Sequence, residues 1–290
     1  MNNVKTLIDT KQSSAANSSE LQAGEVAIVG AGCGQLDLMT IKAARVVSQA
    51  DALVYDSLVS SDILTLVDAD CQRHFVGKRC GQPSTKQEDI NALLCELAQQ
   101  GLKVVRLKGG DPHIFGRGSE EALYLAQRGI KSLFYAGVTA ALGSASSTGI
   151  PLTFRGLARS VTLITGTKMT DADSAYAPAQ WQALLAAQST LVFYMGKEQA
   201  SRISTGLMSE QCSSELPVAF VTNGGRANQI VTYSTVAEMS QTALTIKDSG
   251  PTLIIIGEVV SIGQQLAQLL SDIDYSSAHY NHMVREVEYA

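Results

Sequence analysis

The chain has 290 residues, of which 45% are hydrophobic and 17% are charged, and its mean hydropathy is +0.08. This composition supports one large or two modest domains with a real core and excludes a disordered or coiled-coil protein. The net charge of −5 and the pI near 5.4 argue against a nucleic-acid-binding protein, so an anionic ligand would need a local cluster of Arg and Lys.

Signals for targeting and for metal binding are weak. The five cysteines are an odd number without a C-x-x-C spacing, which favours a reduced, cytoplasmic protein. The four histidines include no H-E-x-x-H, and we expect no metal. Because no segment reaches the ~18 apolar residues of a membrane span, we also expect no membrane partner. The polar start of the chain lacks the apolar core of a signal peptide and predicts a disordered arm over residues 1–23.

Strands and helices are predicted to alternate from residue 25 onward. The expected strands are residues 25–30, 52–55, 74–76, 103–107 and 131–135, and the expected helices are 38–50, 86–99 and 120–128. Ser84 or Thr85 is the expected N-cap of the second helix. Such alternation implies a largely parallel sheet with helices on its faces.

A stretch rich in Gly, Ser and Thr, residues 137–156, reads as a loop, and the alternation then restarts. Strands are expected at 160–165, 190–194, 218–221, 229–234 and 253–256, with helices at 179–187 and 199–208. We therefore predict two α/β domains with mostly parallel sheets and an active-site cleft between them. Their predicted bounds are 24–137 and 138–270, followed by a polar tail over 271–290.

Four polar or glycine-rich segments follow predicted strands. They read "GAGCGQ", "YDSLVS", "GGDPHIFGRG" and "YMG". Because ligands bind beyond the carboxyl ends of strands in open α/β sheets, these segments are expected to share one cleft. The first resembles a dinucleotide-binding turn, but its G-x-G-x-G spacing puts Gln35 where the third glycine belongs, so it is weak evidence for NAD.

The third segment carries the strongest chemical signal. Gly109 and Gly110 allow a ligand to approach the backbone, and Asp111 offers a carboxylate to a hydroxyl or amine. Arg117 and Glu120 could simply pair across a helix turn, but an Arg between two glycines is better explained as a side chain that reaches a ligand.

Basic residues recur near these segments. They include Arg106, Lys108 and Arg117, the loop "RHFVGKRCG" (73–81) and the stretch "IPLTFRGLARS" (150–160) with Arg155 and Arg159. Each loop alone could be a solvated surface. Together they would form a basic patch that suits a polycarboxylate, since guanidinium groups bind carboxylates in a bidentate fork.

The ordered set of motifs resembles the tetrapyrrole methylase family. The set is "VGAG-G", "YDSLVS", "VGKR-G", "VVRLKGGDP-IFGRG-EE", "GIPLT-RG", "TLVFYMG" and "IIIGEVV", spanning residues 29–260. The resemblance implies a homodimer that uses S-adenosyl-L-methionine and releases S-adenosyl-L-homocysteine. It also implies C-methylation of uroporphyrinogen III to precorrin-2 by way of precorrin-1, a step toward siroheme and cobalamin.

The resemblance also assigns roles to residues. Asp56 matches a proton acceptor and Lys78 a proton donor, while Arg117 and Glu120 match catalytic residues that also hold the tetrapyrrole. Arg155 and Met195 match further substrate-binding positions. The positions that match donor contacts are Cys33, Gly109, Gly110, Asp111, Ile114, Thr139, Ala140, Met195 and Gly224.

The chain departs from the family pattern near the inferred cleft. The departures are Cys33 for a usual Pro, Gln35 for an acid, Ala136 for a Pro, Phe154 for a His and Thr167 for a His. They leave open a methylase for a later precorrin, or a protein that binds donor or tetrapyrrole with weak turnover. An NAD-dependent oxidoreductase is a third reading that the glycine spacing disfavours.

Overall fold

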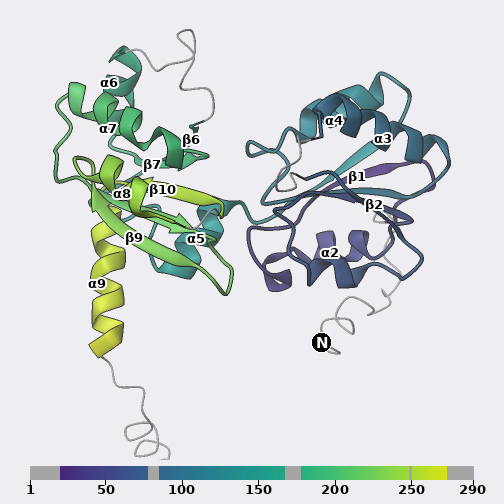
Figure 1. Ribbon diagram of the computed structural model, residues 1–290, viewed down its shortest axis with the longest axis horizontal. Coiled ribbons are helices and arrows are strands. Elements are labelled where there is room, and N and C mark those ends of the chain that lie inside the picture. The colour runs from purple at the N-terminus through teal and green to yellow at the C-terminus, as the bar shows by residue number, and fades with distance from the viewer. Residues whose placement is uncertain (1–19, 78–84, 167–177, 248–249, 273–290) are drawn as a thin grey trace, which may run out of the picture.

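The computed structural model describes residues 20–77, 85–166, 178–247 and 250–272. It contains two five-stranded sheets that form the two lobes of the molecule in Figure 1. The two-domain α/β class predicted from the sequence matches this architecture. The exact domain boundaries stay a prediction. No helix in the described ranges is both long and apolar enough to cross a membrane.

The first sheet has the order β3-β2-β4-β1-β5, and all of its strand pairs are parallel. Its strands are β1 (Val26–Gly30), β2 (Ala52–Tyr55), β3 (Gln72–Phe75), β4 (Val104–Lys108) and β5 (Ser132–Tyr135). Helix α2 (Ile41–Val47) covers one face, and α3 (Gln87–Gln99) and α4 (Gly118–Ala126) cover the other (Figure 1). Short 3-10 turns η1 (Leu36–Leu38) and η2 (Ile63–Leu66) complete this half.

Burial on both faces explains the apolar strands of this sheet. The two faces of β4 differ: Val105 and Leu107 pack toward α2, whereas Val104 packs toward α3 and α4. Arg106 and Lys108 share the side of Val104, since side chains alternate along a strand. The apolar core under α3 and α4 therefore ends in charged groups at the carboxyl end of the sheet.

The second sheet has the order β6-β7-β10-β8-β9. Its strands are β6 (Val161–Thr165), β7 (Thr190–Tyr194), β8 (Pro217–Thr222), β9 (Ile230–Thr235) and β10 (Thr252–Ile256). The pair β6–β7 is parallel, while β7–β10, β10–β8 and β8–β9 are antiparallel. The expectation of a mostly parallel sheet is thus wrong for this half. The alternation of helices and strands along the chain does not determine strand direction. Here β8 and β9 form an antiparallel pair, and the last strand, β10, lies between β7 and β8 and is antiparallel to both.

Helices cover both faces of the second sheet. On one side lie α6 (Pro178–Ala186), α7 (Ala200–Ser209) and α8 (Met239–Thr245), with the turn η3 (Lys197–Gln199) leading into α7. On the other side lie α5 (Ala140–Thr148) and the start of α9 (Val259–Asp272), which extends away from the sheet in Figure 1.

Several predicted boundaries need correction. Residues 137–156 were expected to be a loop, but they contain α5, whose Ala141 is buried against the second sheet. The N-cap of α3 is Lys86 rather than Thr85, and Ser84 lies outside the described residues. Leu21, expected in the arm, is fully buried, and its N–H donates to Gln49 Oε1 at 2.9 Å. Residues 271 and 272, expected in the tail, belong to α9. Residues 1–19 of the arm and 273–290 of the tail lie outside the described ranges.

Candidate functional site

A cavity of about 710 Å³ opens between the two halves, beyond the carboxyl ends of β1, β2, β4 and β7. This is the location predicted from the four polar segments. Most of the predicted site residues lie in its wall: Cys33, Asp56, Gly109, Gly110, Asp111, Ile114, Arg117, Thr139, Ala140, Met195 and Gly224. The sequence therefore located one cavity from motifs that are far apart along the chain.

Two described site residues, Glu120 and Arg155, do not line this wall, and a third predicted residue cannot be placed in it. Lys78 is outside the described residues. Glu120 is exposed, and its carboxylate accepts hydrogen bonds from Arg117, which does line the cavity. Arg155 is exposed in a tight turn that the Phe154–Ala158 bridge closes, and it is not part of the wall. Of the predicted basic patch, the described residues that line the cavity are Arg106, Lys108 and Arg117, joined by Arg226 and two lysines of the second half, Lys197 and Lys247.

The glycine loops form a wall made largely of backbone. Gly32 and Gly110 exchange hydrogen bonds, with N···O distances of 3.2 Å and 2.7 Å, so the loops after β1 and β4 are tied together. Gly110 has φ of +70°, which disfavours any side chain. A Cβ at this position would meet nothing nearer than Thr139 Cα at 3.8 Å. Gly110 thus faces open space toward the start of α5, as a ligand-facing glycine should.

Two polar side chains fix the loops on either side of that space. Asp111 accepts from the N–H of Gly137 at 3.0 Å and from the N–H of His113 at 2.9 Å. The Tyr194 hydroxyl accepts from the N–H of Ala141 at 2.9 Å and shares a 2.7 Å hydrogen bond with Thr139. Burial raises the pKa of Tyr194, so the phenol stays neutral and available as a hydrogen-bonding group.

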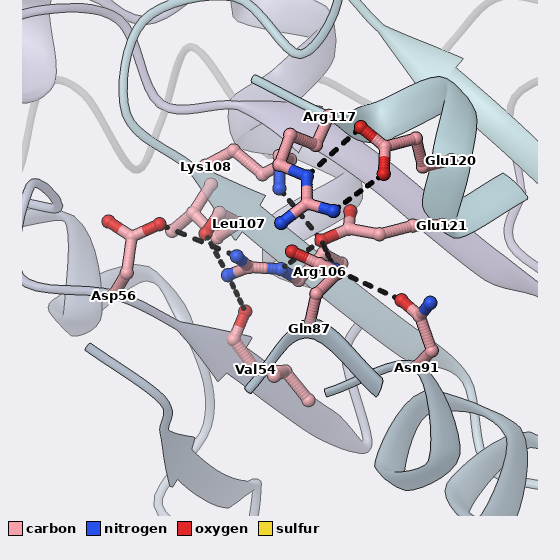
Figure 2. A network of polar contacts seen from close by, with 10 residues as sticks. All are labelled: Val54, Asp56, Gln87, Asn91, Arg106, Leu107, Lys108, Arg117, Glu120 and Glu121. Carbon is pink, nitrogen blue, oxygen red and sulfur yellow. Dashed lines mark hydrogen bonds and ion pairs between the residues drawn. The ribbon is translucent and has the colours of Figure 1, made fainter. Parts of the chain in front are cut away.

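Asp56, Gln87, Arg106 and Lys108 line the cavity on the α3/α4 side, and we call these four residues, together with the buried Glu121 that they surround, the charged wall. Figure 2 shows the polar contacts among them. Glu121 is fully buried, and its Oε1 accepts from Lys108 Nζ at 2.8 Å, Gln87 Nε2 at 3.0 Å and Arg106 Nε at 3.2 Å. Arg106 Nη2 lies 3.5 Å from Asp56 Oδ2. The expected proton acceptor is thus connected to a buried ion cluster.

Burial and the neighbouring charges of the wall act on the pKa of Lys108. Burial, and then the neighbouring Arg106, lower the pKa of Lys108 below its usual value, although Glu121 and Asp56 act in the opposite direction. The loss of hydration therefore destabilises the charged ammonium more than Glu121 and Asp56 stabilise it.

Arg117 has both of the properties that the sequence suggested, a pair with Glu120 and a place beside the ligand space. It forms a bidentate pair with Glu120, at 2.6 Å and 3.0 Å, and both side chains are more than half exposed. It also lines the cavity and has a left-handed backbone with φ of 59°. Phe115 and Met195 in the same wall are left-handed as well. Such conformations cost about 1–3 kcal/mol each and collect at functional sites, which supports a role beyond the surface pair.

Arg226 makes one of the contacts that join the two halves across the cavity. Arg226, in the loop between β8 and β9, donates from Nη2 to the carbonyl oxygen of Leu58 at 2.6 Å. The N–H of Leu58 in turn donates to Asp56 Oδ1 at 3.0 Å. The second half thereby helps to fix the loop that carries Asp56. Sequence reasoning missed Arg226, because an Arg in a polar loop has no distinguishing local signal.

Leu58, Phe115 and Tyr194 lie in segments expected at the cleft but were given no role of their own. Sequence reasoning missed Gln87, Ser144, Lys197, Glu198 and Lys247. For the charged wall a signal existed. Arg106 and Lys108 alternate inside an apolar strand, so they had to be buried on one face together, and buried cations need an anion.

Comparison with known families gives one match over most of the chain. Residues 25–240 match the family model "Tetrapyrrole (Corrin/Porphyrin) Methylases". The chain is 48% identical over 244 residues to siroheme synthase 1 of Yersinia enterocolitica, covering 84% of this chain and 50% of that protein. It is 46% identical to siroheme synthase of Psychromonas ingrahamii, covering 88% and 53%. The chain spans about half the length of these curated relatives.

Two solved structures match this chain over nearly their own full length. The structure of uroporphyrin-III C-methyl transferase from Thermus thermophilus, complexed with S-adenyl homocysteine, is similar with a TM-score of 0.69 and 33% identity. The match covers 82% of this chain and 99% of that one. A cobalt precorrin-4 methyltransferase matches with a TM-score of 0.72 but 21% identity, which speaks for the fold alone.

Proposed function

The chain belongs to the tetrapyrrole methylase family, and we propose that it is an S-adenosyl-L-methionine-dependent C-methyltransferase acting on uroporphyrinogen III. The product is precorrin-2, formed by way of precorrin-1, which feeds siroheme and cobalamin. The observation that carries the proposal is a single cavity with two unlike walls. One is glycine backbone that lets a ligand approach closely, and the other is charged and suits a polycarboxylate.

The donor fits the glycine wall. The open space at Gly110, the adjacent start of α5 at Thr139 and Ala140, and Met195 opposite form a pocket from both halves. A solved relative of matching length holds the demethylated donor, S-adenyl homocysteine. We assign donor binding to Cys33, Gly109, Gly110, Asp111, Ile114, Thr139, Ala140, Met195 and Gly224.

The donor supplies an electrophilic methyl group, which an electron-rich pyrrole carbon of the substrate attacks while the electrons of the broken bond remain on sulfur. The chain then has two tasks. It holds the reactants in line, which accounts for the rigid glycine loops. It also takes up the proton that the methylated macrocycle loses, and Asp56 is the proposed acceptor because its carboxylate lies in the wall beside Arg106.

The remaining assignments extend this proposal to the substrate. Arg117, with Glu120, is proposed to hold the tetrapyrrole and to assist proton transfer, from a position at the end of the donor loop. Lys78 and Arg155 keep the proton-donor and substrate-binding roles that the resemblance assigns. We further propose a homodimer in the cytoplasm, where free thiols such as Cys71 and Cys95 remain reduced.

Anaerobic incubation of the protein with uroporphyrinogen III and methyl-labelled donor tests the proposal. Label should appear in precorrin-1 and then precorrin-2, identified by mass spectrometry. Separately, S-adenosyl-L-homocysteine should raise the melting temperature and NAD should not, because a ligand of the native state stabilises it. If the protein bound the donor but transferred no methyl group to any tetrapyrrole, the proposed enzyme would instead be a binding protein. A shift with NAD alone would contradict the whole assignment.

A further inference from the structure

Lys108 is a buried cation for which neither the family resemblance nor the relatives provide a role. Its side chain is 6% exposed and belongs to the cavity wall. Strand β4 places it on the same face as Arg106, where both meet Glu121 from α4. Figure 2 shows Glu121 at the centre of these contacts. Burying a Lys here is costly, so the position needs an explanation beyond packing.

The hydrogen bonds of the two cations differ. Arg106 uses Nε for Glu121, Nη1 for the carbonyl oxygens of Leu107 and Val54, and Nη2 for Asp56, so each of its nitrogens has a partner. Lys108 Nζ has one partner among the described residues, Glu121 Oε1. An ammonium carries three N–H groups, so two of them have no protein acceptor there. Buried donors without acceptors are rare and destabilising.

The electrostatics of the wall agree with this count. Glu121 is shared by two cations, and Asp56 lies next to Arg106 rather than next to Lys108. The lowered pKa of Lys108 has burial as its largest cause. A negative group arriving in the cavity would provide acceptors for the two N–H groups of Lys108 that lack one there.

We propose that Lys108 binds a carboxylate of the tetrapyrrole, with the buried Glu121 carboxylate orienting its ammonium toward the cavity. This inference rests on the proposed function for the identity of the ligand, and it adds a substrate contact to that site. The ligand class is a polycarboxylate macrocycle. The donor's own carboxylate is the competing ligand, and the experiment separates the two.

Two variants and one control test the proposal. Lys108→Met removes the ammonium at nearly constant size, and Lys108→Met combined with Glu121→Gln also removes the anion that would be left behind. The control is Lys131→Met. Lys131 also bonds a carboxylate, that of Glu25 at 2.6 Å, but it is 68% exposed and lies outside the cavity wall. The double variant serves where the single one fails to fold.

Each protein is titrated by calorimetry with uroporphyrin III, a stable polycarboxylate analogue, and with S-adenosyl-L-homocysteine. Loss of a charge-assisted hydrogen bond in the cavity should raise the Kd for uroporphyrin III, and the KM for uroporphyrinogen III, by about tenfold or more. The Kd for S-adenosyl-L-homocysteine should change less than about twofold. The Lys131→Met control should match the wild type in all three.

Unchanged affinity for uroporphyrin III in a folded Lys108 variant would overturn the proposal. An equal loss of affinity for S-adenosyl-L-homocysteine would overturn it as well. Absence of uroporphyrin III binding by the wild type would overturn it too. Failure of the wild type to methylate uroporphyrinogen III, with binding of uroporphyrin III intact and dependent on Lys108, would contradict the proposed function alone.

Discussion

Glu120 and Glu121 are adjacent in the first turn of α4, yet they belong to two very different ion pairs. Glu120 faces outward and forms a bidentate pair with Arg117, with both partners more than half exposed. Glu121 is fully buried and holds two cations that are almost fully buried as well. Solvent and salt screen the first pair, whereas the second exists only because its charges compensate one another.

The comparison separates function from stability within a few residues. An exposed pair contributes little to folding, so a strained Arg117 in that pair is better explained by a ligand. A buried cluster cannot lose one member without leaving an uncompensated charge, so its residues matter for folding whatever else they do. Four expected outcomes test this contrast.

The largest effect is expected for removal of the buried carboxylate. Glu121→Ala should lower the free energy of unfolding by about 3–5 kcal/mol, because Arg106 and Lys108 would remain buried without their anion. The matched change Glu120→Ala should cost less than about 1 kcal/mol. Urea unfolding followed by circular dichroism measures both. Similar losses in the two variants would mean that burial does not distinguish these glutamates.

The next effect concerns Arg117. Arg117→Ala should raise the KM for uroporphyrinogen III or lower turnover by roughly tenfold to a hundredfold, the range for a lost charge-assisted hydrogen bond. The melting temperature should hardly change. Arg117→Lys should rescue little, because an ammonium lacks the planar fork of a guanidinium.

The control for Arg117 is Arg128→Ala at the other end of α4. Arg128 stacks on Tyr124, with its guanidinium carbon 3.5 Å from the ring centroid, and it is not part of the cavity wall. Turnover should stay normal in that variant. Normal turnover in Arg117→Ala would mean that Arg117 only forms a surface ion pair with Glu120.

The loop that links β4 to α4 connects both ion pairs and supplies the third test. Gly110→Val should weaken binding of S-adenosyl-L-homocysteine by about tenfold, because the side chain enters the cavity and strains a backbone with φ of +70°. Gly129→Val is its control. Gly129 has φ of +74°, and a Cβ there would meet nothing within 4 Å. The two variants should lose similar stability, and only Gly110→Val should lose donor affinity.

The smallest effect is a pH dependence of the exposed pair. The hydrogen bond from Arg117 lowers the pKa of Glu120 below its ordinary value of 4.5. A lowered pKa means that the contribution of Glu120 is present above the ordinary value and is lost as the pH falls through the lowered one. The melting-temperature difference between wild type and Glu120→Gln should be small near neutral pH and vanish in acid and in high salt. A difference that persists in acid would contradict the pairing.

The sequence was informative where local chemistry fixes the structure. Apolar runs that end in glycine located most strands, and the glycine and Asp-Pro signals pointed to the loop Gly109–Asp111, which lines the cavity. It failed where distant contacts decide. The segment of α5 reads as a loop because it is rich in Gly and Ser, and burial of Ala141 against β10 and its neighbours is what favours the helix.

The same limit applies to the site. The backbone wall was predictable because the conformation that favours glycine at Gly110 is a local property of the chain. Arg226 was not predictable, because its partner Leu58 lies 168 residues away. Arg155 was assigned by resemblance and is exposed in this structure, away from the wall. Side chains that meet across two halves depend on how the halves pack, and a single sequence carries little trace of that.

The position of the chain's single tryptophan has a practical consequence. Trp181 lies in α6, is 5% exposed, and packs with Phe193 at a ring-centroid distance of 6.5 Å and against Gly206, where any Cβ would overlap the indole. Its fluorescence emission therefore reports only on the second half, whereas Glu121 belongs to the first. Denaturation of the Glu121→Ala protein followed by emission and by circular dichroism would show whether the halves unfold separately. Coincident transitions would make them one cooperative unit, and an emission transition that stays at its wild-type position would make them two.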